Sequence, residues 1–218
     1  MRTIAFVSQK GGSGKSTIAS SLAVAAHEMN ENVCVIDMDP QGSLMTWART
    51  RAADDIEVLA SGAARLPALL ASLERRGVTL AVLDTPDAEA AASSAAIQAA
   101  DLNLIPSRLC LFDFWASART RTALEEIGAK FVFLLNQCPA GRQAARVKDG
   151  VEALEEMGGL ISPLILARVD YQEAARRGSG VTEFNPCGAA AQEMRDLWQS
   201  IDRRLARAKV GPLAREAA

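Results

Sequence analysis

A glycine-rich string between a short apolar run and a helical segment carries the clearest chemistry in this sequence. Residues 10–17 read KGGSGKST and follow the apolar run at 3–8. Glycines let backbone N–H groups turn toward phosphate oxygens, and the helix that follows presents its positive end. Lys15 can reach terminal phosphates, and the Ser16 hydroxyl can ligate magnesium. The string therefore predicts a phosphate-binding loop, and a tight turn that merely packs is the less favoured reading.

The loop departs from the ordinary G-x-x-x-x-G-K-[ST] pattern at its start. Gln9 stands where the first glycine belongs, and Lys10 precedes a pair of glycines. Phosphoryl transfer depends mostly on positioning and charge neutralisation, so a lysine supplied by a second subunit can make hydrolysis depend on dimerisation. Lys10 is the candidate for that task. The alternative is a solvated loop lysine without a partner.

Carboxylates stand at the ends of two later expected strands. Asp37 and Asp39 stand at the carboxyl end of the apolar run 32–37, and Asp84 ends the run 78–84. In α/β sheets such strand ends border the ligand crevice. There Asp39 could orient water, and Asp84 could hold magnesium through coordinated water. Each acid alone is more often a helix cap or a turn residue, but their order after the loop favours a nucleotide site.

Apolar runs of strand length alternate with segments of helical periodicity. The expected strands cover residues 3–8, 32–37, 56–60, 78–84, 102–106, 130–136 and 160–167. The expected helices cover residues 16–29, 65–76, 112–127, 147–157 and 189–208. Several strands are apolar at successive positions, as strands covered on both faces require. The pattern predicts an α/β fold that is doubly wound, with a mostly parallel central sheet flanked by helices. We expect one domain over residues 1–209 and a frayed tail at 210–218.

The composition of the 218-residue chain excludes several classes of protein. Hydrophobic residues make up 49% and charged residues 23%, so the chain can bury a core and is not disordered. The net charge of -2 gives no whole-molecule attraction for nucleic acid or acidic lipid. Its four cysteines lie far apart, which argues against a zinc site or a disulfide framework. With neither a signal-peptide core nor an apolar run of bilayer length, a cytoplasmic protein is expected.

Three motifs together resemble those of one known family. Residues 10–17, the string DMDPQG at 37–42 and the string DTP at 84–86 closely resemble the ParA/MinD family of deviant phosphate-loop ATPases. The resemblance covers nearly the whole chain, and the string LLNQ at 134–137 looks like that of the short plasmid-partition members. Asp87 is a departure, because many relatives carry a proline or a small residue there. We expect this departure to alter the local loop shape and to leave the nucleotide site unaffected.

The resemblance implies a role for each residue of the site, with ATP and Mg²⁺ as the cofactors. Lys10 would cross a dimer interface to the ATP of the partner, and Lys15 would bind the terminal phosphates. Asp39 would position the attacking water, and Asp84 would act in the second shell of magnesium. The implied catalytic residues are Lys10, Lys15 and Asp39, and the implied metal residues are Ser16 and Asp84. The implied nucleotide-binding residues are Lys10, Gly11, Gly12, Ser13, Gly14, Lys15, Ser16, Thr17 and Asn136, the last facing the adenine.

An ATP-driven dimer of this kind could act in three ways. One is a partition or positioning ATPase that binds DNA without sequence preference and responds to a ParB-like adaptor protein. The second is a MinD-like ATPase on a membrane surface, and the third is a metabolic enzyme on the same scaffold.

The sequence weighs against the second and third functions. The apolar stripe within 189–208 would serve a membrane only if it faced lipid, and a core role is favoured. No cysteine lies between Asp39 and Asp84, and we find no motif for a second substrate, so the metabolic reading is disfavoured.

The first reading predicts an ATP-bound homodimer on the nucleoid, without a stable membrane anchor. Its DNA surface would need a local group of basic side chains. Positive and negative residues nearly balance across 168–218, so an ordinary solvated surface is an equal alternative there. The candidates for DNA contact are Arg168, Arg176, Arg177, Arg195, Arg203 and Arg204.

Overall fold

A parallel sheet with buried faces forms the centre of the molecule. The computed structural model describes residues 1–87, 90–140 and 144–209, and within them six strands form one sheet. The strands are β1 (Arg2–Phe6), β2 (Val33–Asp37), β3 (Glu57–Ala60), β4 (Leu80–Asp84), β5 (Leu102–Ser107) and β6 (Phe131–Leu135). Their order is β3-β2-β4-β1-β5-β6, and every pair is parallel. The predicted fold class, doubly wound with a mostly parallel sheet, is confirmed.

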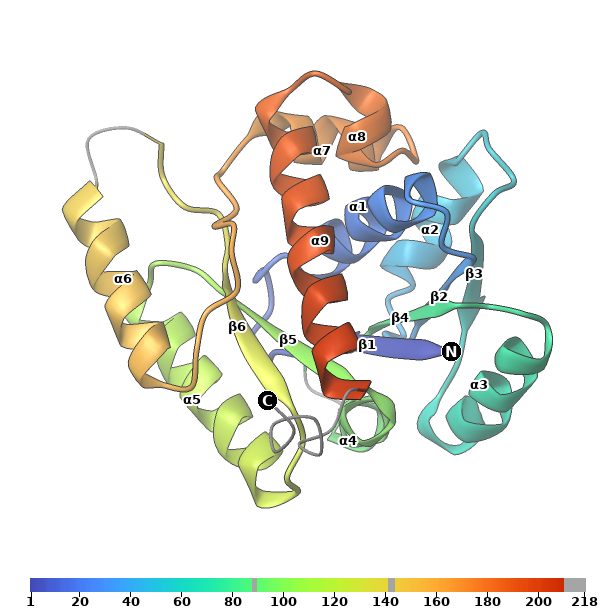
Figure 1. Ribbon diagram of the computed structural model, residues 1–218, viewed down its shortest axis with the longest axis horizontal. Coiled ribbons are helices and arrows are strands. Elements are labelled where there is room, and N and C mark those ends of the chain that lie inside the picture. Colours follow the sequence, from blue (N-terminus) through green and yellow to red (C-terminus); the bar gives the residue numbers. More distant parts are fainter. Residues whose placement is uncertain (88–89, 141–143, 210–218) are drawn as a thin grey trace, which may run out of the picture.

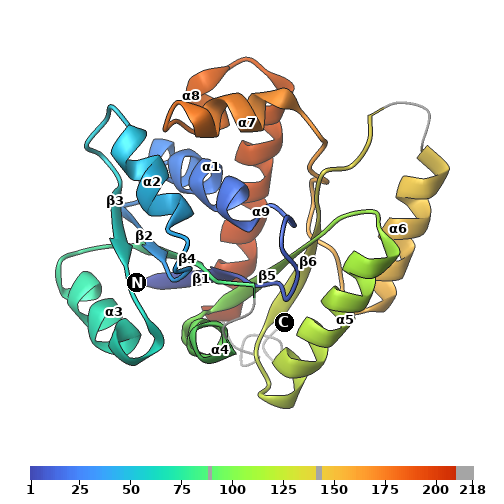
Figure 2. The same ribbon diagram turned by 180° about the vertical axis from the view of Figure 1, so that it is seen from behind.

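Helices cover both faces of this sheet (Figures 1 and 2). One face carries α1 (Lys15–Glu28), α2 (Ser43–Thr50), α7 (Val169–Arg176), α8 (Val181–Phe184) and α9 (Ala189–Lys209). The other face carries α3 (Leu66–Arg75), α4 (Ala90–Ala99), α5 (Leu111–Glu126) and α6 (Ala144–Glu156), with a short 3-10 turn at Ala63–Arg65 before α3. Successive side chains of a strand point to opposite faces, so Ile4 and Phe6 enter one core while Ala5 and Val7 enter the other. Both faces must be apolar, which explains the unbroken apolar runs.

The register of the central strands brings the three sequence motifs together. The loop from Ser8 to Gly14 connects β1 to α1, and Asp37 and Asp84 are the last residues of β2 and β4. Asp84 pairs in register with Phe6 on one side and with Asp37 on the other. Because all strands are parallel, these ends lie at one edge of the sheet, called here the carboxyl edge.

The seventh predicted strand, at 160–167, does not form. Leu160 and Leu166 make only isolated bridges to Phe133 and Cys138, flanking the end of β6. Pro163, in the middle of the segment, has no N–H group to donate to a neighbouring strand. The segment is apolar because it packs beside β6. The helices α2, α4, α7 and α8 were not among the expected elements, and all four have ten residues or fewer.

The apolar stripe of α9 belongs to the core. Its members are all buried against α1 and the sheet: Met194, Leu197, Trp198, Ile201 and Leu205. The predicted core role of the stripe is confirmed, and this part of α9 has no spare apolar face for lipid. Within the described ranges, none of the helices combines the length and apolar composition that a bilayer span needs. The tail at 210–218 lies outside the described residues.

Candidate nucleotide-binding site

The loop after β1 has the backbone geometry that an anion site requires. Gly12 has φ of 75° and Gly14 has φ of 92°, a region that side chains with a Cβ rarely adopt. Gly14 is also the N-cap of α1, and as a glycine it has no side chain to cap this end of the helix. The first N–H groups of α1 are therefore available to a bound anion, whose charge the helix dipole favours.

Asn136 and Gln137, which follow β6, hold the loop from the side. The Asn136 amide donates to the Ser13 carbonyl at 2.7 Å, and Gln137 donates to the Gly12 carbonyl at 3.4 Å. A Cβ on Gly14 would stand 2.4 Å from the Asn136 amide nitrogen, so only glycine fits this approach. The Asn136 side chain thus braces the phosphate loop at the same place where the resemblance puts the adenine.

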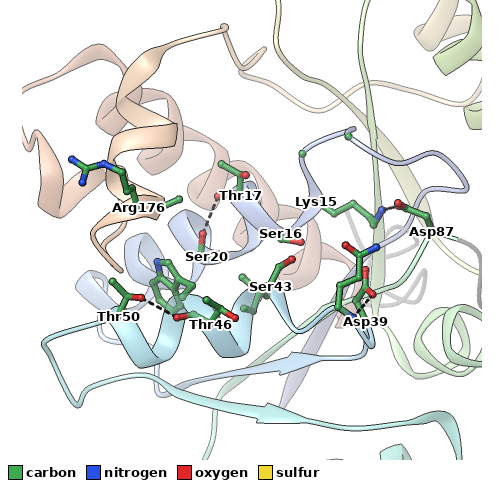
Figure 3. Close-up of a pocket in the computed structure, with 16 residues that line it drawn as sticks. Lys15, Ser16, Thr17, Ser20, Asp39, Ser43, Thr46, Thr50, Asp87 and Arg176 are labelled. Atoms are coloured by element: carbon green, nitrogen blue, oxygen red, sulfur yellow. Dashed lines mark hydrogen bonds and ion pairs between the residues drawn. The ribbon is translucent and has the colours of Figure 1, made fainter.

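Two cavities meet at the start of α1. The larger, of about 490 Å³, is lined by Gly12, Lys15, Asp39 and Asp87 together with residues of α2 (Figure 3). The smaller, of about 320 Å³, is lined by Asn136, Gln137 and the segment from Leu166 to Gln172. Gly14 and Thr17 border both. The phosphate loop therefore lies between two hollows, as a ligand with a phosphate end and a base end requires.

Lys15 is buried and paired within its own chain. Only 7% of its side chain is exposed, and its ammonium forms an ion pair with the Asp87 carboxylate (Figure 3). Asp87 lines the same cavity as Lys15. Sequence reasoning noted Asp87 as a departure from the family pattern and gave it no task. Its partner 72 residues away could not be read from the local pattern.

Lys10 also has an acidic partner in its own chain. Its ammonium pairs with Asp113 near the start of α5, and the Arg108 Nε atom donates to the same carboxylate at 2.5 Å. Asp113 is only 3% exposed, and burial raises its pKa. The hydrogen bonds from Arg108 and Lys10 outweigh that effect and hold the pKa of Asp113 below its ordinary value. Lys10 lies 5.6 Å over the Phe112 ring, so it is not a freely solvated lysine in this state.

The two carboxylates after β2 have different tasks. Asp37 is buried and accepts hydrogen bonds from the Leu44 and Met45 N–H groups at 2.9 and 3.0 Å, which holds the first turn of α2. Asp39 accepts one hydrogen bond from the Gln41 N–H group at 2.9 Å and lines the larger cavity. Of the pair, Asp39 is the carboxylate that can face a ligand.

Asp84 is a fully buried carboxylate that lies beside the Ser16 hydroxyl and the Lys15 ammonium. It is 0% exposed, and neither of its oxygens is hydrogen-bonded within the described residues. Burial raises its pKa to about 7; Ser16 and Lys15 counteract this effect, while Asp37 and Asp39 add to it. No cluster of three or more His, Cys, Asp or Glu that could hold a metal occurs in residues 1–87, 90–140 and 144–209. Mg²⁺ usually takes one or two protein oxygens together with phosphate and water, so Asp84 beside the Ser16 hydroxyl fits that ion.

The candidate DNA-binding arginines do not share one surface. Arg176 lines the larger cavity and pairs with Glu173 at 2.7 Å, while Arg168 lines the smaller one and pairs with Glu193 at 2.8 Å. Arg177 lies 4.9 Å over the Phe184 ring, and Arg195 donates to the Pro186 carbonyl at 2.8 Å. These four belong to α7, its flanks and the first half of α9.

Arg203 and Arg204 lie at the opposite edge of the sheet. They line a third cavity, of about 670 Å³, together with Lys130 and Arg207. Leu102 and Phe131, the first residues of β5 and β6, also line it, so it lies at the amino edge of the sheet. None of the four cations forms an ion pair with a carboxylate of the described chain. We call Lys130, Arg203, Arg204 and Arg207 the amino-edge cluster.

Sequence reasoning missed half of this cluster. The signal for Arg207 was its helical spacing of three and four residues from Arg204 and Arg203. No local signal marked Lys130, which precedes β6 and joins the arginines only through the fold.

Comparison with known proteins shows the family to which the domain belongs. The family model of the CobQ/CobB/MinD/ParA nucleotide binding domain matches residues 4–181. Maintenance of carboxysome distribution protein A of Gloeobacter kilaueensis is 32% identical over 210 residues, covering 93% of this chain and 94% of the relative. The chromosome-partitioning ATPase Soj of Thermus thermophilus is 23% identical, covering 92% and 95%. The MinD cell division protein of Aquifex aeolicus has a similar fold, with a TM-score of 0.76 at 16% identity over 93% of this chain and 98% of that one.

Proposed function

Because the chain belongs to the CobQ/CobB/MinD/ParA nucleotide-binding family, we propose that it is an ATP-hydrolysing, dimerising switch that positions a cargo in the cell. Members of the ParA/MinD family are phosphate-loop ATPases, and the resemblance of the motifs to that family is confirmed. The observation that carries the proposal is the meeting of Lys15, Asp39 and Asp84 at one edge of the sheet, around the glycine loop. Residues 1–209 form the single ATPase domain in this proposal.

ATP binding is the first task of the site. The N–H groups from Gly11 to Lys15 surround the phosphates, and Lys15 neutralises their terminal charge. The base enters the smaller cavity beside Asn136, with Thr17 at the junction of the two cavities. Ser16 and Asp84 would hold Mg²⁺, which neutralises charge on the phosphate oxygens when it is bound.

Hydrolysis is the second task. Asp39 lines the cavity with a carboxylate that makes one backbone hydrogen bond, so it can accept a hydrogen bond from the attacking water. In the dimer, Lys10 gives up its ion pair with Asp113 and completes the nucleotide site of the second copy. Hydrolysis removes the phosphate that bridges the two copies, and the dimer dissociates.

The relatives and the surface charge support a proposal for the cargo and for the surface on which it is positioned. The names of two relatives refer to carboxysome distribution and to chromosome partitioning. For this chain we propose a cargo linked through a ParB-like adaptor protein, with the nucleoid in the cytoplasm as the support. DNA would contact the amino-edge cluster, whose four cations form no ion pair within the described residues and can neutralise phosphates. A membrane support is disfavoured because the apolar stripe of α9 is buried.

The test is nucleotide-dependent assembly. The wild-type chain with ATP and Mg²⁺ should form a dimer in size-exclusion chromatography with light scattering, and it should release phosphate. Lys15→Ala should bind no ATP, because the loop N–H groups alone cannot offset the terminal charge. The matched control is Lys148→Ala, which removes a solvent-exposed lysine from α6 and should behave as wild type. ATP binding by Lys15→Ala with wild-type affinity would refute the site, and a wild-type chain that stays monomeric with ATP would refute the switch.

A further inference from the structure

Asp87 occupies the place where a bound phosphate is expected. One oxygen of its carboxylate pairs with the Lys15 ammonium. The other lies 2.8 Å from the position that a Cβ on Gly11 would take, so it is directed against the glycine loop. Figure 3 shows the Asp87 carboxylate and the Lys15 side chain pointing toward each other across the cavity. The cation and the loop that would bind phosphate therefore already hold an anion of the chain itself.

The backbone before Asp87 is held in place from two sides. The buried Thr85 hydroxyl donates to the Phe6 carbonyl of β1 at 2.8 Å. The Ser93 hydroxyl of α4 donates to the Pro86 carbonyl at 3.2 Å. These two hydrogen bonds thus fix the backbone just before Asp87. The Asp87 side chain projects into the cavity from that point.

The Asp87 side chain is only partly enclosed. It is 34% exposed, whereas Lys15 is buried. Asp87 also lines a separate cavity of about 470 Å³, beside Ser93, Ser94 and Arg119. A carboxylate displaced from Lys15 has room on that side, next to another cation.

We propose that Asp87 is an internal competitor of the nucleotide, which neutralises Lys15 in the empty site and is displaced by the phosphates of ATP or ADP. The inference deepens the proposed function and rests on it, since it concerns the same loop. A phosphate bound at the loop would meet and repel the Asp87 carboxylate, which holds the Lys15 ammonium with one oxygen and lies against Gly11 with the other. The apparent dissociation constant is therefore raised by the fraction of molecules in which Asp87 holds Lys15. The competition weakens the binding of ligands whose phosphates contact the loop. It leaves the binding of a ligand without phosphates unchanged.

The experiment is calorimetric titration of the wild-type chain, Asp87→Asn and Asp87→Ala with ATP, ADP and adenosine. Chelator is present, so that no metal site contributes. We expect both variants to bind ATP and ADP about tenfold more tightly than wild type, with adenosine binding unchanged. The gain should shrink as salt is raised, because the competing ion pair is electrostatic. The matched control is Asp149→Asn, which removes the same charge from the exposed face of α6 and should leave all three affinities unchanged.

The titrations separate this inference from the proposed function. Unchanged or weaker binding of ATP by both Asp87 variants, in a chain whose wild type binds ATP, would overturn the inference alone. Equal tightening of adenosine binding would also overturn it, because a general loosening of the loop would then explain the effect. If neither the wild type nor the variants bind ATP, the proposed function fails and this inference fails with it.

Discussion

Replacing Asp84 by asparagine should make the empty protein more stable at neutral pH than the wild type. Asp84 is fully buried and its oxygens lack hydrogen-bond partners in the described chain, so its charged form is costly there. Burial raises its pKa to about 7 from the ordinary value of 3.8. Asparagine has nearly the same shape and carries no charge at any pH, so it removes the cost of ionisation.

The magnitude follows from the two pKa values. Between about pH 4 and pH 7 the unfolded chain has released the Asp84 proton while the folded chain still holds it, so the folded state binds more protons. The free energy of unfolding therefore falls as pH rises through this window. Over the whole window the loss amounts to about 4 kcal/mol, since each pH unit is worth about 1.4 kcal/mol. Above the folded pKa the loss is complete.

The assay is urea unfolding of the wild type and Asp84→Asn, in chelator and without nucleotide, at several values between about pH 4 and pH 8. Groups that do not interact with Asp84 titrate equally in both chains, so their effects cancel in the difference. The free energy of unfolding of Asp84→Asn minus that of the wild type should grow by about 4 kcal/mol from the lowest to the highest pH. Asp149→Asn serves as the control, with a difference from wild type that stays constant. A difference that does not change with pH would refute the assignment of Asp84 as an uncompensated buried acid.

Three further variants test the separate tasks of the nucleotide site and of the amino-edge cluster. Asp39→Ala should bind ATP and dimerise as wild type does while phosphate release falls at least about a hundredfold, because only the water-orienting carboxylate is lost; normal turnover in a phosphate-release assay would contradict this. Lys10→Ala should bind ATP but remain a monomer by light scattering, and an unaltered ATP-dependent dimer would count against a role across the interface. Lys130→Glu with Arg207→Glu should weaken retention of non-specific duplex DNA about tenfold or more and reduce its salt dependence. Arg177→Glu, at the opposite edge of the sheet and outside the nucleotide cavity, should have no such effect on DNA; equal losses in both variants would refute the amino-edge assignment.

The sequence alone determined the parts of this protein that are contiguous. The phosphate loop at 10–17 could be recognised because its glycines, lysine and hydroxyls act within one turn of chain that a strand and a helix hold. The parallel sheet could be predicted because burial on both faces demands strands that are apolar at every position. The core role of the α9 stripe followed from helical spacing for the same reason: the periodicity of one element is a local property.

Only the tertiary structure decided which distant residues meet. Lys15 and Asp87 are 72 residues apart, and no local pattern couples them; the pairing exists because the ends of β1 and β4 lie side by side. The pairing of Lys10 with Asp113 likewise depends on the start of α5 lying near the loop. The segment at 160–167 has the composition of a strand, but Pro163 interrupts its pairing. Arginines close together in the sequence were divided between opposite edges of the sheet, because α9 runs along its face and extends about 30 Å.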